Sequence, residues 1–267
     1  MSATLFSNWP DPVVIKGQNY LTPDGPFPRV TGCLKVVGLG TEGLIKWSAN
    51  TERAATLEAA GTVYSDRVAA SSHDPSDFVP AVEARLGAAR QHQRILAKAG
   101  DIGHEIHGRI QWHLQREMVG AVGPEPRLSS PAALAFSSWR AWWATAGIKP
   151  LRVEQVVWDP ELEYAGTVDL IGEHEGVPKV YDWKSSKGIY ETMHMQVAGY
   201  IHAGRRWEPR LMPGEIVRLP KDADGSLEVE VKPLGHLYGG KVRTYEELLD
   251  GFKAALTLHR LFVAEAP

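Results

Sequence analysis

Two aspartates and a lysine in the second half of the chain have types and a spacing that suit acid–base or metal chemistry. If the residues between the two aspartates form a β-hairpin with its turn centred between Glu175 and Gly176, Asp169 lies opposite Asp182. Because side chains alternate between the two faces of a strand, Asp182 and Lys184 point to the same side. The pattern therefore predicts that two carboxylates and one ammonium group converge on one spot.

Two facing carboxylates repel each other, so one of them holds a proton unless a cation lies between them. Hard oxygen ligands of this kind suit Mg²⁺ or Mn²⁺. Such an ion keeps several waters, completes its shell with a substrate phosphate and activates water for attack. A lysine beside it can orient or deprotonate that water. The plainer alternative is a surface hairpin that carries a solvated aspartate–lysine pair.

Four short motifs occur in an order that resembles the RecB-like branch of the PD-(D/E)XK nuclease superfamily. They are Gly103–His107, which fits a G-x-x-x-H pattern, then Gly166–Asp169, Asp182–Lys184 and Gln196–Tyr200. The segment 29–50 also resembles the N-terminal helices of phage and actinobacterial members. In this resemblance the third acidic position of the family signature is an aspartate, Asp182.

The resemblance implies a metal-dependent DNA exonuclease that hydrolyses phosphodiester bonds and leaves 5′-phosphates in phage-type recombination, repair or genome processing. It implies one or two Mg²⁺ or Mn²⁺ ions, held by His107, Asp169, Asp182 and the main-chain carbonyl of Trp183. Catalytic roles fall to these three side chains and to Lys184. The predicted substrate contacts are Lys187, Gln196, Tyr200, Arg205 and Arg206, with Arg109 and the rings of Trp183 and Tyr190 as further candidates.

Glu154 lies one strand earlier, where relatives often carry a glutamate. It is either an accessory carboxylate of the metal site or an exposed strand residue. The expected partner is DNA, single- or double-stranded. A recombination, single-strand-binding or helicase protein is a second expected partner, because the chain contains no G-x-x-x-x-G-K-[ST] phosphate loop of its own.

Two other functions compete with the nuclease hypothesis. A catalytically inactive DNA-binding or structural relative would keep the fold without the chemistry. A dinucleotide-binding enzyme would use Gly38–Gly43, which matches G-x-G-x-x-G, but that motif needs a buried strand before it. The run His104–His107 is one residue too short for the zinc-protease motif, whose histidines are four residues apart.

The composition excludes several classes of protein. With 43% hydrophobic and 23% charged residues among 267, the chain is not disordered, collagen-like or a coiled-coil rod. Cys33 is the only cysteine, so neither an intrachain disulfide nor a cysteine-held iron–sulfur cluster can form. No run of about 18 apolar residues occurs, and no secretory signal is evident, so we expect a cytoplasmic protein (the host-cell cytoplasm if phage-encoded) with no membrane partner.

The expected fold is α/β, a restriction-endonuclease-like core with a mixed central sheet flanked by helices and a helical N-terminal elaboration. One domain of residues 1–267 is expected, divided into an arm and helices (1–100), a catalytic core (101–235) and a C-terminal helix (236–267). Apolar periodicity predicts helices over 31–60, 77–118 with a break near Gly100, 131–146, 189–203 and 242–264. Strands are expected over 151–158, 164–172, 178–183, 216–219 and 227–231, the last two joined at Asp224-Gly225; loops are expected over 1–30, 61–80 and 120–127.

Overall fold

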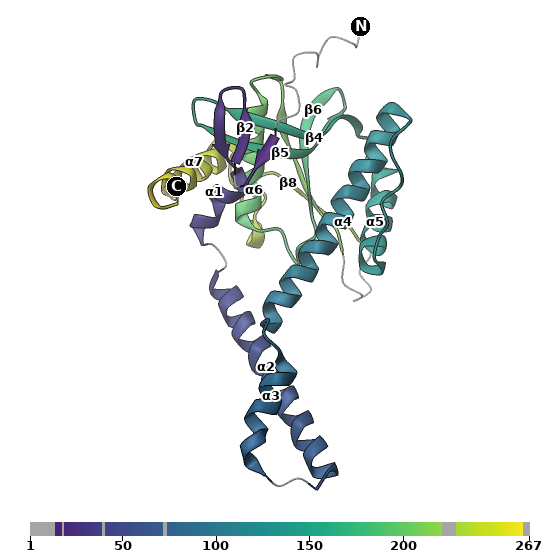
Figure 1. The fold of residues 1–267 in the computed structure, drawn as a ribbon. Helices are drawn as coiled ribbons and strands as arrows, with labels where there is room; N and C mark the ends of the chain where they lie inside the picture. The colour runs from purple at the N-terminus through teal and green to yellow at the C-terminus, as the bar shows by residue number, and fades with distance from the viewer. Residues whose placement is uncertain (1–13, 18, 39–40, 72–73, 221–227, 264–267) are drawn as a thin grey trace. The chain divides into compact units, whose positions relative to one another are not determined.

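A computed structural model describes residues 14–263, except 18, 39–40, 72–73 and 221–227. The chain forms two compact units, one of residues 38–101 and one that combines residues up to 37 with those from 102 onward. The boundary between them near residue 101 falls inside a single long helix, α4 (Gln91–Val119). Figure 1 shows the elements of both units. Residues 14–37 thus belong to the same unit as the sheet rather than to the helices that follow them.

The elements follow one another as a small sheet, helices, a large sheet with one inserted helix, and a closing helix. In order they are β1 (Val14–Lys16), β2 (Asn19–Thr22), β3 (Gly25–Pro28), α1 (Val30–Cys33), η1 (Leu34–Val37), α2 (Thr41–Ala69), η2 (Pro75–Asp77), α3 (Phe78–Leu86), α4, α5 (Ser130–Trp143), β4 (Lys149–Asp159), β5 (Tyr164–His174), β6 (Val177–Lys184), α6 (Glu191–Gly204), β7 (Met212–Arg218), β8 (Glu230–Pro233), η3 (Tyr238–Gly240) and α7 (Tyr245–Phe262).

The central sheet has five strands in the order β4-β5-β6-β7-β8. The pair β6 and β7 is parallel and the other neighbours are antiparallel, so the sheet is mixed. The helix α6 makes the connection between the two parallel strands, as such a pair requires. The expected α/β architecture with a mixed sheet flanked by helices is confirmed.

The hairpin of β5 and β6 has the register that its sequence predicts. His174 pairs with Val177, and Glu175 and Gly176 form the turn with φ values of 52° and 76°. Positive φ at both central positions is typical of the two-residue turns that match the twist of a hairpin. Carried along the strands, this register places the site aspartates of β5 and β6 opposite each other.

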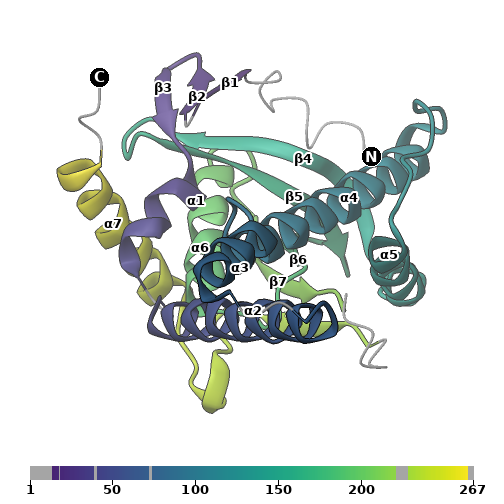
Figure 2. The same cartoon turned by 60° about the horizontal axis from the view of Figure 1, so that its bottom comes forward.

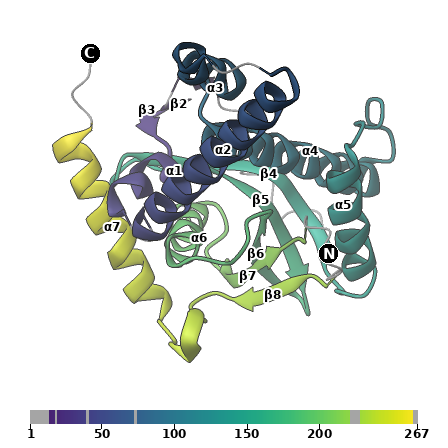
Figure 3. The same ribbon diagram turned by 90° about the horizontal axis from the view of Figure 1, so that it is seen from below.

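Each face of the sheet carries its own hydrophobic core. One core lies under α6 and α7 and includes Ile171, Val180, Ile216 and Phe252. The other lies under α4 and α5, where buried tryptophans from α5 and from β6 meet edge to face. Figure 3 shows these two helix pairs on opposite sides of the sheet. In α5, Trp139 is fully buried in this core, while Trp142 is only partly buried.

The unit of residues 38–101 is a separate helical assembly. Its helices α2 and α3 lie side by side (Figure 1), and a small apolar cluster of Ala59, Val63 and Val82 joins them. The side chain of Glu52 accepts a hydrogen bond from the His92 amide at the start of α4. The apolar cluster of this helical unit is much smaller than either core of the sheet.

Three sequence expectations about the first half of the chain were wrong. Residues 14–28 form a three-stranded antiparallel meander instead of a loose arm, and it lies beside β4 and β5 (Figure 2). The helix α2 continues through Gly61 to Ala69, where a loop was expected. The break in the following helical zone lies at Gly87, which ends α3 with φ of 71°, and α4 runs through Gly100.

Two further expectations concern the glycine-rich motif at Gly38 and the turn between β7 and β8. The dinucleotide hypothesis needs a strand before Gly38, but residues 30–37 are helical, so that hypothesis loses its structural context. The Asp224-Gly225 turn lies outside the described residues, although β7 and β8 pair as the strands on either side of it were expected to.

Candidate metal centre

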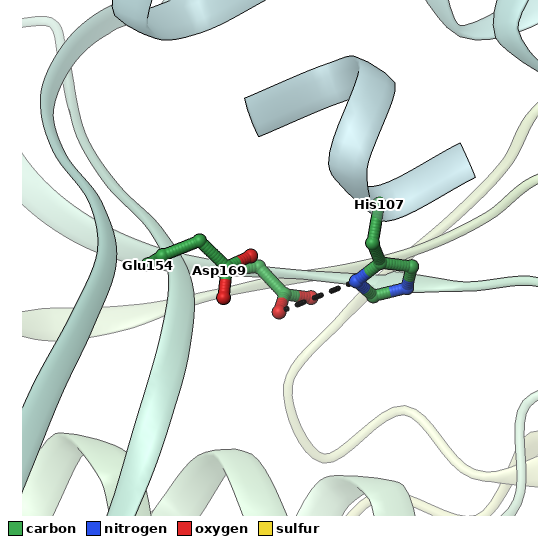
Figure 4. A group of neighbouring side chains, drawn as sticks. All are labelled: His107, Glu154 and Asp169. Carbon is green, nitrogen blue, oxygen red and sulfur yellow. Dashed lines mark ion pairs between the residues drawn. The ribbon is translucent and has the colours of Figure 1, made fainter. Parts of the chain in front are cut away.

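Three side chains from three different elements converge at the middle of the sheet. His107 comes from α4, Glu154 from β4 and Asp169 from β5, and each offers a ligand atom within 4.8 Å of the others (Figure 4). The Nδ1 atom of His107 lies 3.6 Å from Oδ1 of Asp169. One imidazole and two carboxylates form a donor set that suits a divalent transition metal or Mg²⁺. We refer to these three residues as the ligand group.

The ligand group lies where the regular alternation of β5 breaks. Val168 packs into the core under α6 and α7, whereas Leu170, two residues later, packs into the core under α4 and α5. Residues two apart normally share a face of a strand. The strand therefore changes the orientation of its faces at Asp169.

The neighbouring strand β4 breaks at the matching position. Val157 packs under α6 and α7, but Val153 packs on the α4 and α5 side, although residues four apart should share a face. Between them Glu154 has a φ of 51°, a left-handed conformation that is uncommon for a residue other than glycine. The register of β4 with β5 places Glu154 opposite Asp169. This double break turns both carboxylates toward His107.

A second group of side chains, which we call the lysine network, lies on β6 and α6. Lys184 Nζ is 2.6 Å from Asp182 Oδ2 and donates to Gln196 Oε1 at 3.2 Å. The Nε2 group of Gln196 donates to Asp182 Oδ1 at 3.1 Å and to the Tyr200 hydroxyl at 2.9 Å. With its carbonyl and both amide hydrogens engaged, the Gln196 amide has a single orientation. Gln196 and Tyr200, four residues apart, thus lie on one face of α6.

The main chain of β6 joins the two groups. The amide of Trp183 donates to Oδ2 of Asp169 at 2.7 Å, and its two neighbours in sequence belong to the lysine network. The buried Oδ2 atom of Asp182 has the Lys184 ammonium as its partner at 2.6 Å. Burying a carboxylate is costly, and the Lys184 ammonium offsets that cost for Asp182.

Burial and charge shift the pKa values of the ligand group in opposite directions. Burial lowers the pKa of His107, but the Asp169 carboxylate beside it raises that pKa by more, so the net shift is upward. For Asp169, burial acts to raise the pKa, and the His107 ring and the Lys184 ammonium lower it overall. Burial, followed by repulsion from Asp169, raises the pKa of Glu154 to about 7. Burial raises the pKa of Asp182 to about 6, despite its lysine partner.

Two motif glycines allow the elements of the site to approach closely. A Cβ on Gly103 would lie 2.9 Å from the Ser185 hydroxyl, one residue beyond Lys184, so this glycine lets α4 reach the end of β6. A Cβ on Gly166 would lie 2.3 Å from the Tyr200 ring and 3.2 Å from Val30. Neither glycine has positive φ, so their role is close packing: Gly166 faces a buried ring, whereas at Gly103 the Ser185 hydroxyl could turn away.

The remaining predicted site residues lie apart from the two groups. The Trp183 side chain is 1% exposed among other tryptophans, so it cannot stack on a base, and the contact it makes with the site is through its amide. Arg205 donates to the Leu211 carbonyl and stacks on Tyr245, and Arg206 pairs with Asp24. Arg109 donates to Pro126 and pairs with Glu125, which anchors the connection from α4 to α5.

Only two predicted substrate contacts outside the lysine network have exposed side chains near its end of the sheet. Lys187 is exposed on the connection from β6 to α6, and Tyr190, 49% exposed, begins α6. Sequence reasoning missed one residue next to the site. Tyr20 of β2 shares a hydrogen bond of 2.8 Å with Thr167 of β5, and nothing in the Pro- and Gly-rich segment around Tyr20 pointed to that contact.

Comparisons with known proteins give no indication of the function. No protein-family model and no curated protein matches this chain. Within the described residues, no helix is both long and apolar enough to cross a lipid bilayer. The structure therefore shows a mixed α/β architecture in which the ligand group lies beside the lysine network.

Proposed function

We propose that this protein is a metal-dependent DNA nuclease with a restriction-endonuclease-like core. The single observation that carries the proposal is the placement of the ligand group next to Lys184. Asp169 of that group accepts a hydrogen bond from Trp183, the residue between Asp182 and Lys184. Metal ligands and a fixed cation in one place are the parts that hydrolysis of a phosphodiester needs.

The ligand group would hold Mg²⁺ or Mn²⁺, with Asp182 as a further carboxylate at its edge. When bound, the ion would supply Lewis-acid polarisation of a phosphate oxygen and a more acidic water. The donor set includes an imidazole, which favours Mn²⁺ over Mg²⁺ in affinity.

The chain's own residues have separate tasks in the proposed reaction. Lys184 Nζ is held by Asp182 and Gln196, so its third hydrogen can be directed at the attacking water or at a phosphate oxygen on which charge develops. Gln196 keeps the lysine in place, and Tyr200 in turn orients Gln196. Lys187 and Tyr190 are suited to contact the backbone and a base of a nucleic acid strand, and hydrolysis would leave a 5′-phosphate.

The test is cleavage of end-labelled single- and double-stranded DNA with Mg²⁺ or Mn²⁺. We expect the unaltered protein to cleave, and we expect Asp169→Asn and Lys184→Met to lose at least a hundredfold in rate. Lys179→Met is the matched control, because Lys179 is on the same strand, five residues before Lys184, and is not part of the network. Thermal melts would show that each variant is folded.

Three results would contradict the proposal in different ways. Absence of cleavage with any metal, while DNA is still bound, would favour the inactive DNA-binding relative. Cleavage that survives in both site variants would place the active site elsewhere. Cleavage of RNA but not of DNA would keep the chemistry and replace the substrate.

A further inference from the structure

The N-terminal meander contacts the sheet immediately beside the ligand group. Tyr20 is 5% exposed, and its hydroxyl lies 2.8 Å from the Thr167 hydroxyl. Together with Phe27 it packs on Trp158 and Ala165 of the two broken strands. Arg29 adds a short parallel bridge to Ala165. The meander therefore covers β4 and β5 on one side of the break.

The covering of the sheet changes at the break itself. Trp158 and Ala165 are covered by the meander, whereas Val153 and Leu170 are covered by α4 and α5. A hydrogen bond from the meander holds Thr167, two residues before Asp169. The break in both strands thus falls between the part of the sheet that the meander covers and the part that α4 and α5 cover. Tyr20 bonds to β5 at the boundary of the part under the meander.

The strained backbone of Glu154 needs such support. A left-handed conformation for a non-glycine residue costs on the order of 1–3 kcal/mol and persists only where the surroundings determine it. Glu154 is also close enough to Tyr20 that its carboxylate, after burial, contributes to raising the pKa of that phenol. The residue across from Glu154 is Asp169, and Thr167 lies opposite Val156, two residues along β4. The hydrogen bond between Tyr20 and Thr167 is therefore attached to β5 directly beside the strained residue of β4.

We propose that Tyr20, through its hydrogen bond with Thr167, is a positioning residue that holds Glu154 and Asp169 in the geometry required for a divalent cation. This inference rests on the metal centre of the proposed function, and it makes the meander part of the site. Loss of the hydroxyl lets β5 relax next to the break, so the two carboxylates no longer converge on His107. Residues that orient metal ligands from outside typically change metal affinity by about 10- to 100-fold.

The experiment measures Mn²⁺ affinity by titration calorimetry on the full chain, together with melting temperature in EDTA. Tyr20→Phe and Thr167→Val remove the two hydroxyls and keep the packing shapes. The matched control is Tyr164→Phe, on the same strand β5, because the Tyr164 side chain is also buried but its hydroxyl donates to the Gly199 carbonyl on the opposite face. Each of these variants loses one hydrogen bond.

We expect Tyr20→Phe and Thr167→Val each to weaken Mn²⁺ binding about tenfold, and the double variant to weaken it no further. Tyr164→Phe should lower the melting temperature by a similar amount and change the affinity less than twofold. Unchanged Mn²⁺ affinity in Tyr20→Phe would overturn the inference, as would an equal loss in Tyr164→Phe. Absence of Mn²⁺ binding by the unaltered chain would overturn it as well, whereas Mn²⁺ binding without DNA cleavage would reject only the nuclease proposal.

Discussion

The pKa of the Glu154 carboxyl is raised from 4.5 to about 7 in the metal-free protein because the group is partly buried and lies beside the Asp169 carboxylate. An acid whose pKa is higher in the folded state favours folding while it is protonated, so stability falls as pH rises from about 4.5 through 7. A bound divalent cation would reverse this effect, since it binds the ionised form.

Glu154→Gln should therefore stabilise the metal-free protein at high pH and not at low pH. Glutamine resembles the protonated acid, so the two proteins should be nearly equally stable at pH 4, below both pKa values. At pH 8 the variant should be more stable by on the order of 3 kcal/mol, the free energy of a shift from 4.5 to about 7. Urea denaturation in EDTA at both pH values measures this, and a difference that does not change with pH would contradict it.

At the scale of elements, the site depends on how closely β5 approaches α6. Gly166→Ala would place a methyl group 2.3 Å from the buried Tyr200 ring, whose hydroxyl is bonded to Gln196. The ring must move, so we expect a loss of about 1–3 kcal/mol in stability. Urea denaturation checks this. Gly108→Ala, in the open interior of α4, is the control and should raise stability by about 0.5–1 kcal/mol.

The elements also show what the sequence can and cannot predict. The β5–β6 register follows from local signals, because a Glu-Gly pair between two alternating segments specifies the turn and hence which aspartates face each other. The meander was missed because its strands have three or four residues each and are stabilised by the packing of Tyr20 and Phe27 on Trp158, residues far away in sequence. The left-handed Glu154 has no local signal, since its strain is supported by tertiary contacts.

Glycine spacing was misleading in the helical half for a similar reason. Gly87 and Gly100 carry the same local preference against helix, yet only Gly87 adopts a positive φ and ends a helix. Gly61 and Gly100 remain inside long helices, where hydrogen bonds continue through them. The choice among such glycines is made by packing and by capping groups such as Glu52 at the start of α4.

At the scale of the whole molecule, the two units should differ in stability because their cores differ in size. The helical unit depends on a small cluster around Ala59, Val63 and Val82. Val82→Ala should cost about 1–2 kcal/mol there, from the two methyl groups removed. Hydrogen exchange should accelerate within residues 41–101 and stay unchanged in β4–β7, since local opening follows compact units. Equal acceleration in the sheet would mean that the units unfold together.

The bond between Tyr20 and Thr167 also bears on how the protein is made. Its two residues are 147 positions apart, so at about 5–20 residues per second a ribosome needs roughly 7 to 30 s to produce the second after the first. During that interval the meander has no sheet to cover. Tyr20 and Phe27, which later pack on Trp158 and Ala165, stay exposed until then, and Glu154 and Asp169 cannot yet lie opposite each other. The meander can therefore dock only once residue 167 of the 267 has been made, so this part of the fold is completed late in synthesis.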